Sequence, residues 1–444
     1  MSDLGKPTAT AEPPSAARLD SHTPQSRHRV PGLALASLGL VLVFLLTLWP
    51  APQEAKRSQL TPVWCLVCGD IGMQDVLQNV MMLLPFGLGL GLLGWRLPRA
   101  VLLGFALALG VEVLQYTVVP GRDASVSDVV TNTLGTTLGV LAAGRIDWLL
   151  HPPPRDAGRL ALGALGLWAA LWVASGWLLG ASAGPAPWRA VLRPELIDAP
   201  PFTGEIVSAE LSGTALTNGD QALPPRVITA YEHDSVAFTA AVIMGPPVPE
   251  RRGLLEVRDG DSTLQLTVAE SGGALRFAMR TRSSGLLLRP LSFRMPAIPV
   301  EPPGTPATLS VRREAGTIVV GPRAPGDAGV RAAIGPHWLA TVLLPVEARP
   351  GLGWEWFAYL WVASLLLPVG WWAAQSAPAS TLTLAFTAFA VVIGGLRTVP
   401  PAFLLSHTSA VGWAMACGSL LLGFLLGRVR SRFPCRPTGS AIRS

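Results

Sequence analysis

Long apolar stretches fill both ends of the chain, and short polar segments separate them. A helix that spans a bilayer needs about 20 mainly apolar residues, because its backbone polar groups must be paired within the helix. The pattern predicts a polytopic α-helical membrane protein with about eight spans, and seven is the main alternative. The seventh stretch is the weakest because it is short and Pro400 and Pro401 follow it. The predicted spans cover residues 33–49, 76–95, 100–119, 126–143, 160–179, 354–372, 381–396 and 409–427.

The middle of the chain, residues 185–350, has a different pattern. Short runs in which apolar and polar residues alternate replace the long stretches, and turns containing glycine separate some of the runs. Regular short strands of this kind predict an inserted all-β domain, an antiparallel jelly-roll sandwich. The clearest runs cover residues 238–243, 254–257, 263–268, 275–280 and 308–312, with turns at 259–261 and 271–273.

The order of these strands and the spacing of their turns resemble the concanavalin A-like or laminin-G-like jelly roll, a fold that often binds glycans. Glycoside hydrolysis would need carboxylates at alternating strand positions, and the segment from Glu256 to Asp259 does not provide that array. The resemblance therefore implies binding rather than hydrolysis. Asp259 and Asp261 flank Gly260 as in a tight turn, so a calcium site is the less favoured interpretation and no metal is predicted.

Composition and charge agree with a membrane protein. Hydrophobic residues make up 50% of the chain and charged residues 14%, and the net charge of +6 is too small and too scattered to indicate nucleic acid. Arginines in the flanks of the spans fall on one side if there are eight spans, and positive flanks stay cytoplasmic. Both termini are then cytoplasmic and the insert is extracytoplasmic. The arginines are Arg18, Arg27, Arg29, Arg96, Arg99, Arg145, Arg155, Arg159, Arg428, Arg430, Arg432 and Arg436.

These observations predict the order of the parts along the chain. The alternative for the first span is a cleaved signal peptide, because a basic flank precedes its apolar run. The expected parts are a disordered cytoplasmic tail (1–32), a four-helix membrane module (33–150), a fifth transmembrane helix (160–180), an extracytoplasmic β-sandwich (185–350), three C-terminal transmembrane helices (354–427) and a basic cytoplasmic tail (428–444).

Polar residues interrupt the second, third and fourth spans near their extracytoplasmic ends. They come in pairs three or four residues apart, so each pair projects from one helix face, and a rise of about 1.5 Å per residue puts the three faces at similar depths. Such a cluster is either a ligand site or a set of hydrogen bonds between packed helices, and an ionisable group such as Glu112 favours the ligand site. The candidate ligand-binding residues are Asp75, Asn79, Glu112, Gln115, Arg122, Asp128 and Asn132.

The same stretch resembles a known family. In order and spacing, its residues are similar to the VanZ-like membrane family, named for a protein linked to teicoplanin resistance. The residues that carry the resemblance are the segment from Asn79 to Gly87, then Glu112 and Gln115, then Arg122, Asp128, Asn132, Gly135 and Gly139. The resemblance covers residues 35–150 and does not reach the insert or the last spans. Because the activity of the family is not settled, it implies a place in the bacterial cell envelope, in the cytoplasmic (inner) membrane, and a polar site rather than a reaction.

Other chemistry in the chain is sparse. Cys65 and Cys68 form a CxxC motif outside the second span, where a disulfide, free thiols or a metal are the alternatives, in falling order. The sequence offers no catalytic motif and indicates no cofactor. We therefore expect an envelope protein that contacts the lipid bilayer and binds a glycan, glycolipid or glycopeptide. The alternatives are an enzyme or transporter for a lipid-linked sugar, and a scaffold.

Overall fold

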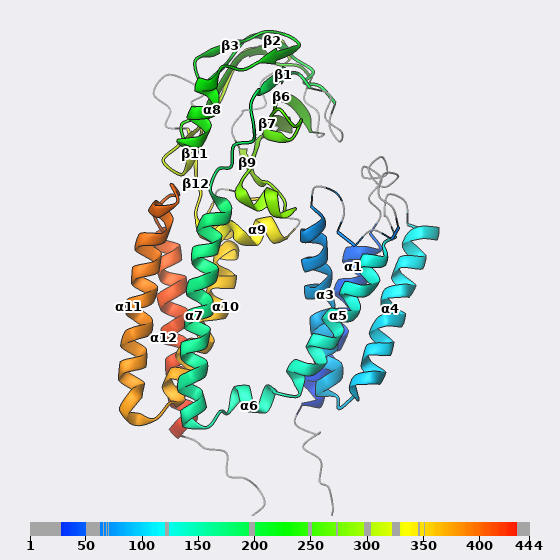
Figure 1. Cartoon of the computed structure of the whole chain (residues 1–444), viewed down its shortest axis with the longest axis vertical. Coiled ribbons are helices and arrows are strands. Elements are labelled where there is room, and N and C mark those ends of the chain that lie inside the picture. Colours follow the sequence, from blue (N-terminus) through cyan, green and yellow to red (C-terminus); the bar gives the residue numbers. More distant parts are fainter. Residues whose placement is uncertain are drawn as a thin grey trace, which may run out of the picture.

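The structure is a computed structural model with two groups of helices side by side and a β-sandwich above them (Figure 1). This arrangement confirms the predicted class, a helical membrane protein with an inserted β domain. The described residues are 28–49, 63–64, 66–67, 69, 71–119, 124–194, 200–246, 251–271, 274–296, 303–321, 329–344, 347–349 and 351–432.

The first helical group contains α1 (Arg29–Thr47), α3 (Gly72–Leu92), α4 (Leu97–Thr117) and α5 (Val126–Ala143). Helix α3 packs between α1 and α5, and α4 packs on α5. The close contact between α3 and α5 depends on glycine, because a Cβ atom on Gly139 would lie 2.3 Å from the carbonyl oxygen of Leu84. Small residues permit such contacts between membrane helices, as the spacing of Gly135 and Gly139 predicts.

The second group contains α7 (Pro154–Leu179), α10 (Leu352–Gln375), α11 (Pro378–Ala402) and α12 (Ala410–Arg432), and the short helix α6 (Ile146–Leu150) leads into it. Its core includes Trp168 and Trp172, whose rings stack with centroids 5.9 Å apart. The seventh predicted span is longer than expected, because α11 continues through Pro400 and Pro401. Near a helix end these prolines leave most of the ladder of hydrogen bonds intact.

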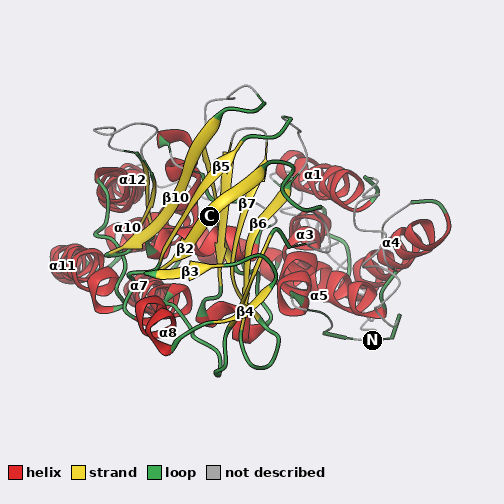
Figure 2. Cartoon of the chain, turned by 90° about the horizontal axis from the view of Figure 1, so that it is seen from above, coloured by secondary structure: helices red, strands yellow, loops and turns green. Residues whose placement is uncertain are grey.

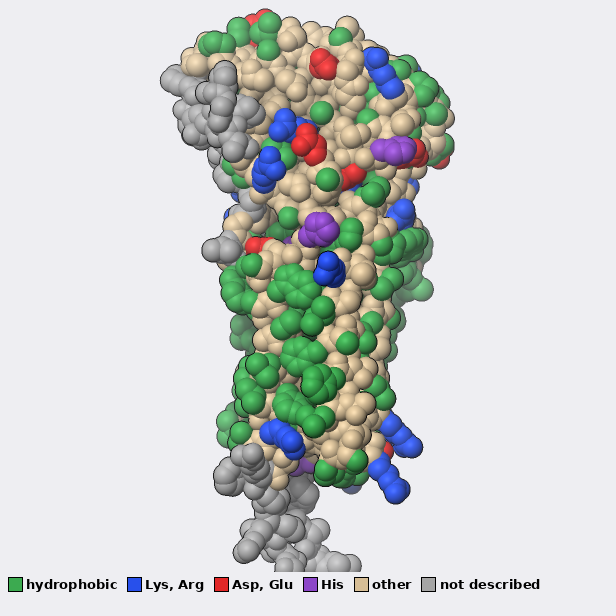
Figure 3. Space-filling model, turned by 90° about the vertical axis from the view of Figure 1, so that its left-hand side faces the viewer, with side chains coloured by type: hydrophobic (Ala, Val, Ile, Leu, Met, Phe, Trp, Pro, Cys, Tyr) green, Lys and Arg blue, Asp and Glu red, His purple; other side chains and the backbone are tan. Residues whose placement is uncertain are grey.

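Seven of the described helices are long and apolar enough to cross a membrane. The predicted span that is not among these seven is the fourth, residues 126–143; it forms α5, with the predicted bounds, and runs beside α3 (Figure 1). Asp128, Asn132 and several threonines lower its hydropathy. Figure 3 shows hydrophobic side chains over much of the helical part, with charged ones near its lower end and on the sandwich. The helical part thus has the surface of a membrane-embedded region.

The sandwich consists of two antiparallel sheets, each with six strands. One has the order β4-β1-β6-β7-β8-β9 and the other β12-β11-β10-β5-β2-β3. The clearest predicted runs are β5, β6, β7, β8 and β10, and the predicted turn at 259–261 joins β6 to β7. Residues 272 and 273 of the other predicted turn lie outside the described residues. The bounds are β1 (Arg189–Leu192), β2 (Glu205–Leu211), β3 (Thr214–Leu216), β4 (Asp220–Ala222), β5 (Ala237–Ile243), β6 (Arg252–Arg258), β7 (Leu264–Ser271), β8 (Ala274–Met279), β9 (Leu291–Pro296), β10 (Pro306–Glu314), β11 (Thr317–Val320) and β12 (Val330–Ala333).

Alternating apolar residues explain the core between the sheets. On β8, Leu275, Phe277 and Met279 point into it, and Val268 on β7 stands opposite Phe277. Short helical segments lie between or after the strands, in stretches whose sequence lacks the alternation typical of a strand. They are α8 (Pro225–Glu232), η3 (Arg282–Leu286), η4 (Pro336–Trp338) and α9 (Leu339–Leu343).

The sandwich is fixed to the second helical group. Its core continues into Leu179 of α7, Ala358 of α10 and Leu405 in the connection between α11 and α12. In that connection, the Ser406 amide donates to the Ile334 carbonyl at 2.9 Å, and the Ser406 hydroxyl donates to the Gly316 carbonyl at 2.6 Å. The insert therefore shares its core with the helices on which it stands.

The sandwich also reaches the first helical group. Seen from above, β6 and β7 lie on the side of α1 and α3 (Figure 2). The carbonyl of Leu287, just after η3, accepts hydrogen bonds from the amides of Met73 and Gln74 at 3.2 and 3.4 Å. The Gln78 side chain donates to the Leu343 carbonyl of α9 at 2.8 Å. These bonds join the first turns of α3 to the lower edge of the sandwich.

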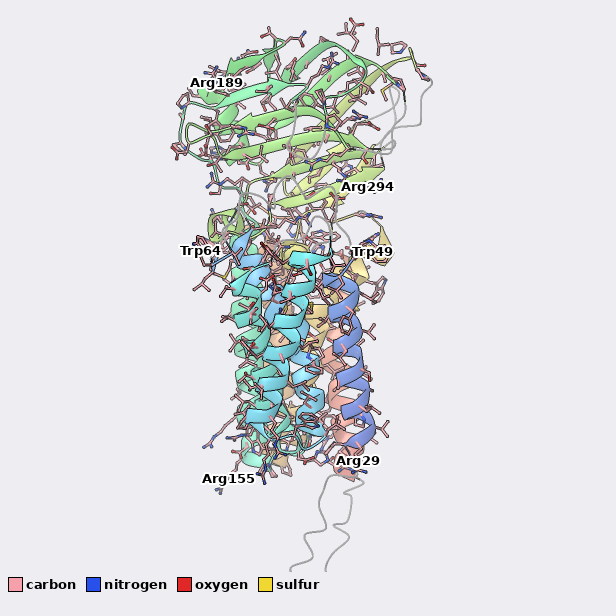
Figure 4. All side chains as sticks on the ribbon, turned by 90° about the vertical axis from the view of Figure 1, so that its right-hand side faces the viewer. Arg29, Trp49, Trp64, Arg155, Arg189 and Arg294 are labelled. Carbon is pink, nitrogen blue, oxygen red and sulfur yellow. The ribbon has the colours of Figure 1, made fainter. Side chains whose placement is uncertain are left out.

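The charged ends of the helices follow the predicted pattern. Arg29 and Arg155 lie at the end of the helical part that is remote from the sandwich, whereas Trp49 and Trp64 lie at the near end (Figure 4). The cytoplasmic location of the arginine end, and hence the extracytoplasmic location of the sandwich, stays a prediction from the distribution of positive charge.

Candidate functional site

The predicted polar faces of α3, α4 and α5 meet at the helix ends nearest the sandwich. Glu112 on α4 is only 6% exposed, and its Oε2 atom accepts a hydrogen bond from the Ser125 amide at 2.7 Å. Ser125 is the N-cap of α5, and its hydroxyl accepts from the Ser127 amide at 3.1 Å. Serine suits this position because its oxygen satisfies an amide that has no partner within the helix. The start of α5 is thereby held against the end of α4.

Three carboxylates form a series across the helices. The Asn79 side chain hydrogen-bonds Asp128, which links α3 to α5, and Asp75 lies close enough to Asp128 for electrostatic repulsion. Asp128 in turn repels Glu112 on α4. Like charges in a partly buried site cost free energy unless they are compensated. The series is therefore an electrostatic feature that simple helix packing does not require.

Buried amides adjoin the carboxylates. Gln115 and Asn132 lie one helical turn from Glu112 and Asp128 on the same helix faces. Gln115 is 7% exposed and donates from Nε2 to the Thr47 carbonyl at 2.9 Å, whereas its Oε1 atom has no partner. Asn132 is 3% exposed and its Oδ1 atom also has none.

The structure thus brings together six of the seven candidate residues, from Asp75 to Asn132. The seventh, Arg122, lies outside the described residues, as do Cys65 and Cys68, so their predicted roles stay predictions. Gln78, which is also polar and near the start of α3, instead donates to the Leu343 carbonyl of α9, at the lower edge of the sandwich.

Sequence reasoning missed several members of the site. Ser125 and Ser127 hold the start of α5, and Gln74 is 2% exposed in the first turn of α3. The signal for Ser125 was present, because a serine three residues before an acidic residue is a typical start of a helix. Gln74 gives no such signal, because its burial depends on the first turns of α3 lying under Leu287.

The turn between β6 and β7 is structural. Oδ1 of Asp259 accepts from the amides of Asp261 and Thr263, at 3.0 and 2.8 Å. Oδ2 accepts from the side chains of Gln265 and Arg280, at 2.7 and 3.0 Å. Four protein donors thus occupy the carboxylate, as expected for a turn rather than a calcium site. Across the described ranges, no group of three or more His, Cys, Asp or Glu residues is placed to hold a metal ion.

Fold and site together define a multi-pass helical membrane protein with a polar cluster at one membrane face and a β-sandwich above it. Residues 36–147 match the VanZ/LLP1 family. This segment contains most of α1 and all of α3, α4 and α5, so the first helical group is a VanZ-like module, as the sequence resemblance implies. The match covers about a quarter of the chain and leaves out the sandwich and the second group. No curated protein and no solved structure matches the chain.

Proposed function

We propose that this protein binds a glycan, glycolipid or glycopeptide of the bacterial cell envelope at the extracytoplasmic end of its VanZ-like module. The observation that carries the proposal is the cluster of Asp75, Asp128 and Glu112 with buried amides at the helix ends under the sandwich. Sugars offer many hydroxyl donors, and carboxylate and amide oxygens are the acceptors that pair with them.

The energetic cost of the cluster supports a binding role. Neutral amides and glycines can join membrane helices, and Gly139 already brings α3 and α5 into contact. A carboxylate such as Glu112 adds a desolvation cost to the same contact, and its repulsion with Asp128 adds another. A group that costs free energy in the unliganded protein is explained if a ligand compensates it.

The position of the sandwich also supports the proposal. Its lower edge contacts the first turns of α3, which carry Asp75 and Asn79. A ligand anchored in the membrane would place its headgroup at this level. The predicted likeness of the sandwich to glycan-binding jelly rolls is an analogy of fold and stays a prediction.

A second candidate function is an enzyme or transporter acting on a lipid-linked sugar. The feature that favours it is the proximity of Glu112 and Asp128, because two interacting carboxylates can exchange a proton with a substrate or couple its movement to protons. Turnover or movement of the sugar, as opposed to binding alone, distinguishes this candidate.

The experiment compares the wild type with Glu112→Gln in binding of a lipid-linked sugar and of teicoplanin by the purified protein in nanodiscs. Glutamine keeps an acceptor for the Ser125 amide but removes the charge, so we expect folding to persist and binding to be lost. Glu355→Gln is the matched control, because Glu355 lies in the first turn of α10, outside the cluster. Equal binding by all three proteins would refute the proposal and favour packing as the role of Glu112.

A further inference from the structure

The polar cluster has an excess of hydrogen-bond acceptors. When ionised, the carboxylates of Asp75, Glu112 and Asp128 can accept hydrogen bonds but cannot donate them. To these are added Oδ1 of Asn132 and Oε1 of Gln115, both on side chains that are more than nine-tenths buried and both without a partner among the described residues. A buried acceptor without a donor costs about 1–3 kcal/mol. The site is therefore built for a group that donates.

Four described donors beside the cluster are already used. The Gln115 amide group donates to the Thr47 carbonyl, and the hydroxyl of Ser127 donates to the Leu66 carbonyl at 2.6 Å. The hydroxyl of Thr131 donates to the Ser127 carbonyl at 2.8 Å, and that of Thr136 donates to the Asn132 carbonyl at 3.2 Å. These donors satisfy backbone carbonyls, which leaves Oδ1 of Asn132 and Oε1 of Gln115 for a ligand to bind.

The chemistry of the acceptors selects among ligand groups. A phosphate or carboxylate would add negative charge to three carboxylates and would be repelled. A metal ion does not fit, since no suitable group of His, Cys, Asp or Glu occurs in the part of the chain that the structure describes. A neutral hydroxyl donates one hydrogen bond, whereas an ammonium group donates three and carries a compensating charge.

We propose that the cluster of Asp75, Asp128, Glu112, Gln115 and Asn132 binds a protonated primary amine, as carried by an amino sugar with a free amino group. This rests on the proposed function and deepens it, because it specifies which part of an envelope ligand enters the site. The carboxylates supply the charge, and the two buried amide oxygens accept further hydrogen bonds from the ammonium group.

The test uses three small probes with the full-length protein in nanodiscs, measured by calorimetry. Glucosamine carries an ammonium group, N-acetylglucosamine replaces it with a neutral amide, and ethanolamine carries the amine without the sugar. We expect glucosamine to bind at least about tenfold more tightly than N-acetylglucosamine, the effect of a charge-assisted hydrogen bond. If ethanolamine binds as tightly as glucosamine, the site recognises the ammonium group alone, and a lipid headgroup is the source of the amine. If ethanolamine binds more weakly, the site also recognises the sugar, and an amino sugar is the source.

Three variants test whether the preference for glucosamine over N-acetylglucosamine depends on the carboxylates of the cluster. Glu112→Gln should reduce the preference for glucosamine to less than about twofold, and Asp128→Asn should reduce it in the same direction, while Glu355→Gln should retain it. Equal binding of glucosamine and N-acetylglucosamine, with loss of both in Glu112→Gln, would overturn the amine and leave the glycan proposal standing. Absence of binding to every probe would overturn the amine proposal, and the binding of the lipid-linked sugar then decides the proposed function separately.

The guanidinium of Arg122 is the other cation to distinguish. If Arg122 filled the cluster, glucosamine would compete with it, and Arg122→Gln would tighten glucosamine binding by tenfold or more. The proposal expects a change of less than about threefold, because glucosamine has no anionic group for Arg122 to bind. A tightening of tenfold would overturn the proposal.

Discussion

The contact between α3 and α5 offers a direct test of how the site is held. A Cβ atom on Gly139 would lie 2.3 Å from the Leu84 carbonyl oxygen and 2.4 Å from the Leu88 amide nitrogen, and both belong to backbone that cannot rotate away. Gly139→Ala must therefore push α5 away from α3. Gly110 on α4 is the matched control, because a Cβ atom there meets no atom within 4 Å.

Two effects decide the magnitude. Replacing a helical glycine with alanine stabilises by about 1 kcal/mol, whereas overpacking a tight contact costs about 1–3 kcal/mol. Gly110→Ala experiences only the first effect and should stabilise. Gly139→Ala experiences both, at the upper end of the cost because the clash is with backbone, and should destabilise by about 1–2 kcal/mol.

Denaturation of the two purified variants in detergent, followed by circular dichroism, measures the difference. Because α5 carries Asp128 and Asn132, Gly139→Ala should also weaken ligand binding, whereas Gly110→Ala should preserve it. If Gly139→Ala were as stable as Gly110→Ala, the close contact between α3 and α5 would be wrong, and with it the position of the cluster.

Three further predictions concern the rest of the chain. Burial lowers the pKa of His337, whose ring stacks on Tyr359, from 6.5 to about 3. Between pH 6.5 and pH 3 this imidazole therefore gains a proton in the unfolded chain but not in the folded one. The free energy of unfolding should fall by about 1.4 kcal/mol per pH unit below pH 6.5, which is about 2 kcal/mol at pH 5. His337→Phe should remove that slope, and equal denaturation profiles for both proteins would contradict this. Arg313→Met should cost about 3–5 kcal/mol because it leaves Asp234, its buried ion-pair partner, without compensation, and adding Asp234→Asn should recover part of the loss in the same assay. Reporter fusions after Trp148, in the turn at Asp259 and at the C-terminus should report inside, outside and inside; an inside signal at Asp259 would place the sandwich in the cytoplasm.

The helices were predictable because each carries its own signal. The bounds of α5 agree with the sequence prediction, since Ser125 starts the helix and the apolar run ends at Gly144. The length of α11 was underestimated, because Pro400 and Pro401 were taken to end the helix, whereas prolines this near a helix end leave most of its hydrogen bonds intact. The five clear strands alternate regularly, whereas β3 and β4 have three residues each, too few to show a period.

The site was predictable in part. Spacing along one helix gives pairs such as Asp128 and Asn132, because a helical turn fixes their relation. The spacing of residues along one helix does not predict hydrogen bonds between helices. The bond between Asn79 and Asp128 and that between the Ser125 amide and Glu112 depend on how the helices pack. The ion pair of Arg313 with Asp234 was also missed, since two charges far apart in sequence give no sign that they are buried together.

The first turn of α3 links the two parts of the protein physically. A helix begins with amides that have no partner within the helix, and here the amides of Met73 and Gln74 are satisfied by the Leu287 carbonyl of the sandwich. Asp75 follows directly, and Asn79 comes one turn later with its bond to Asp128. A displacement of the lower edge of the sandwich would therefore change where α3 starts, and with it the geometry of the carboxylates. The same two backbone hydrogen bonds thus join the lower edge of the sandwich to the helix that carries Asp75 and Asn79.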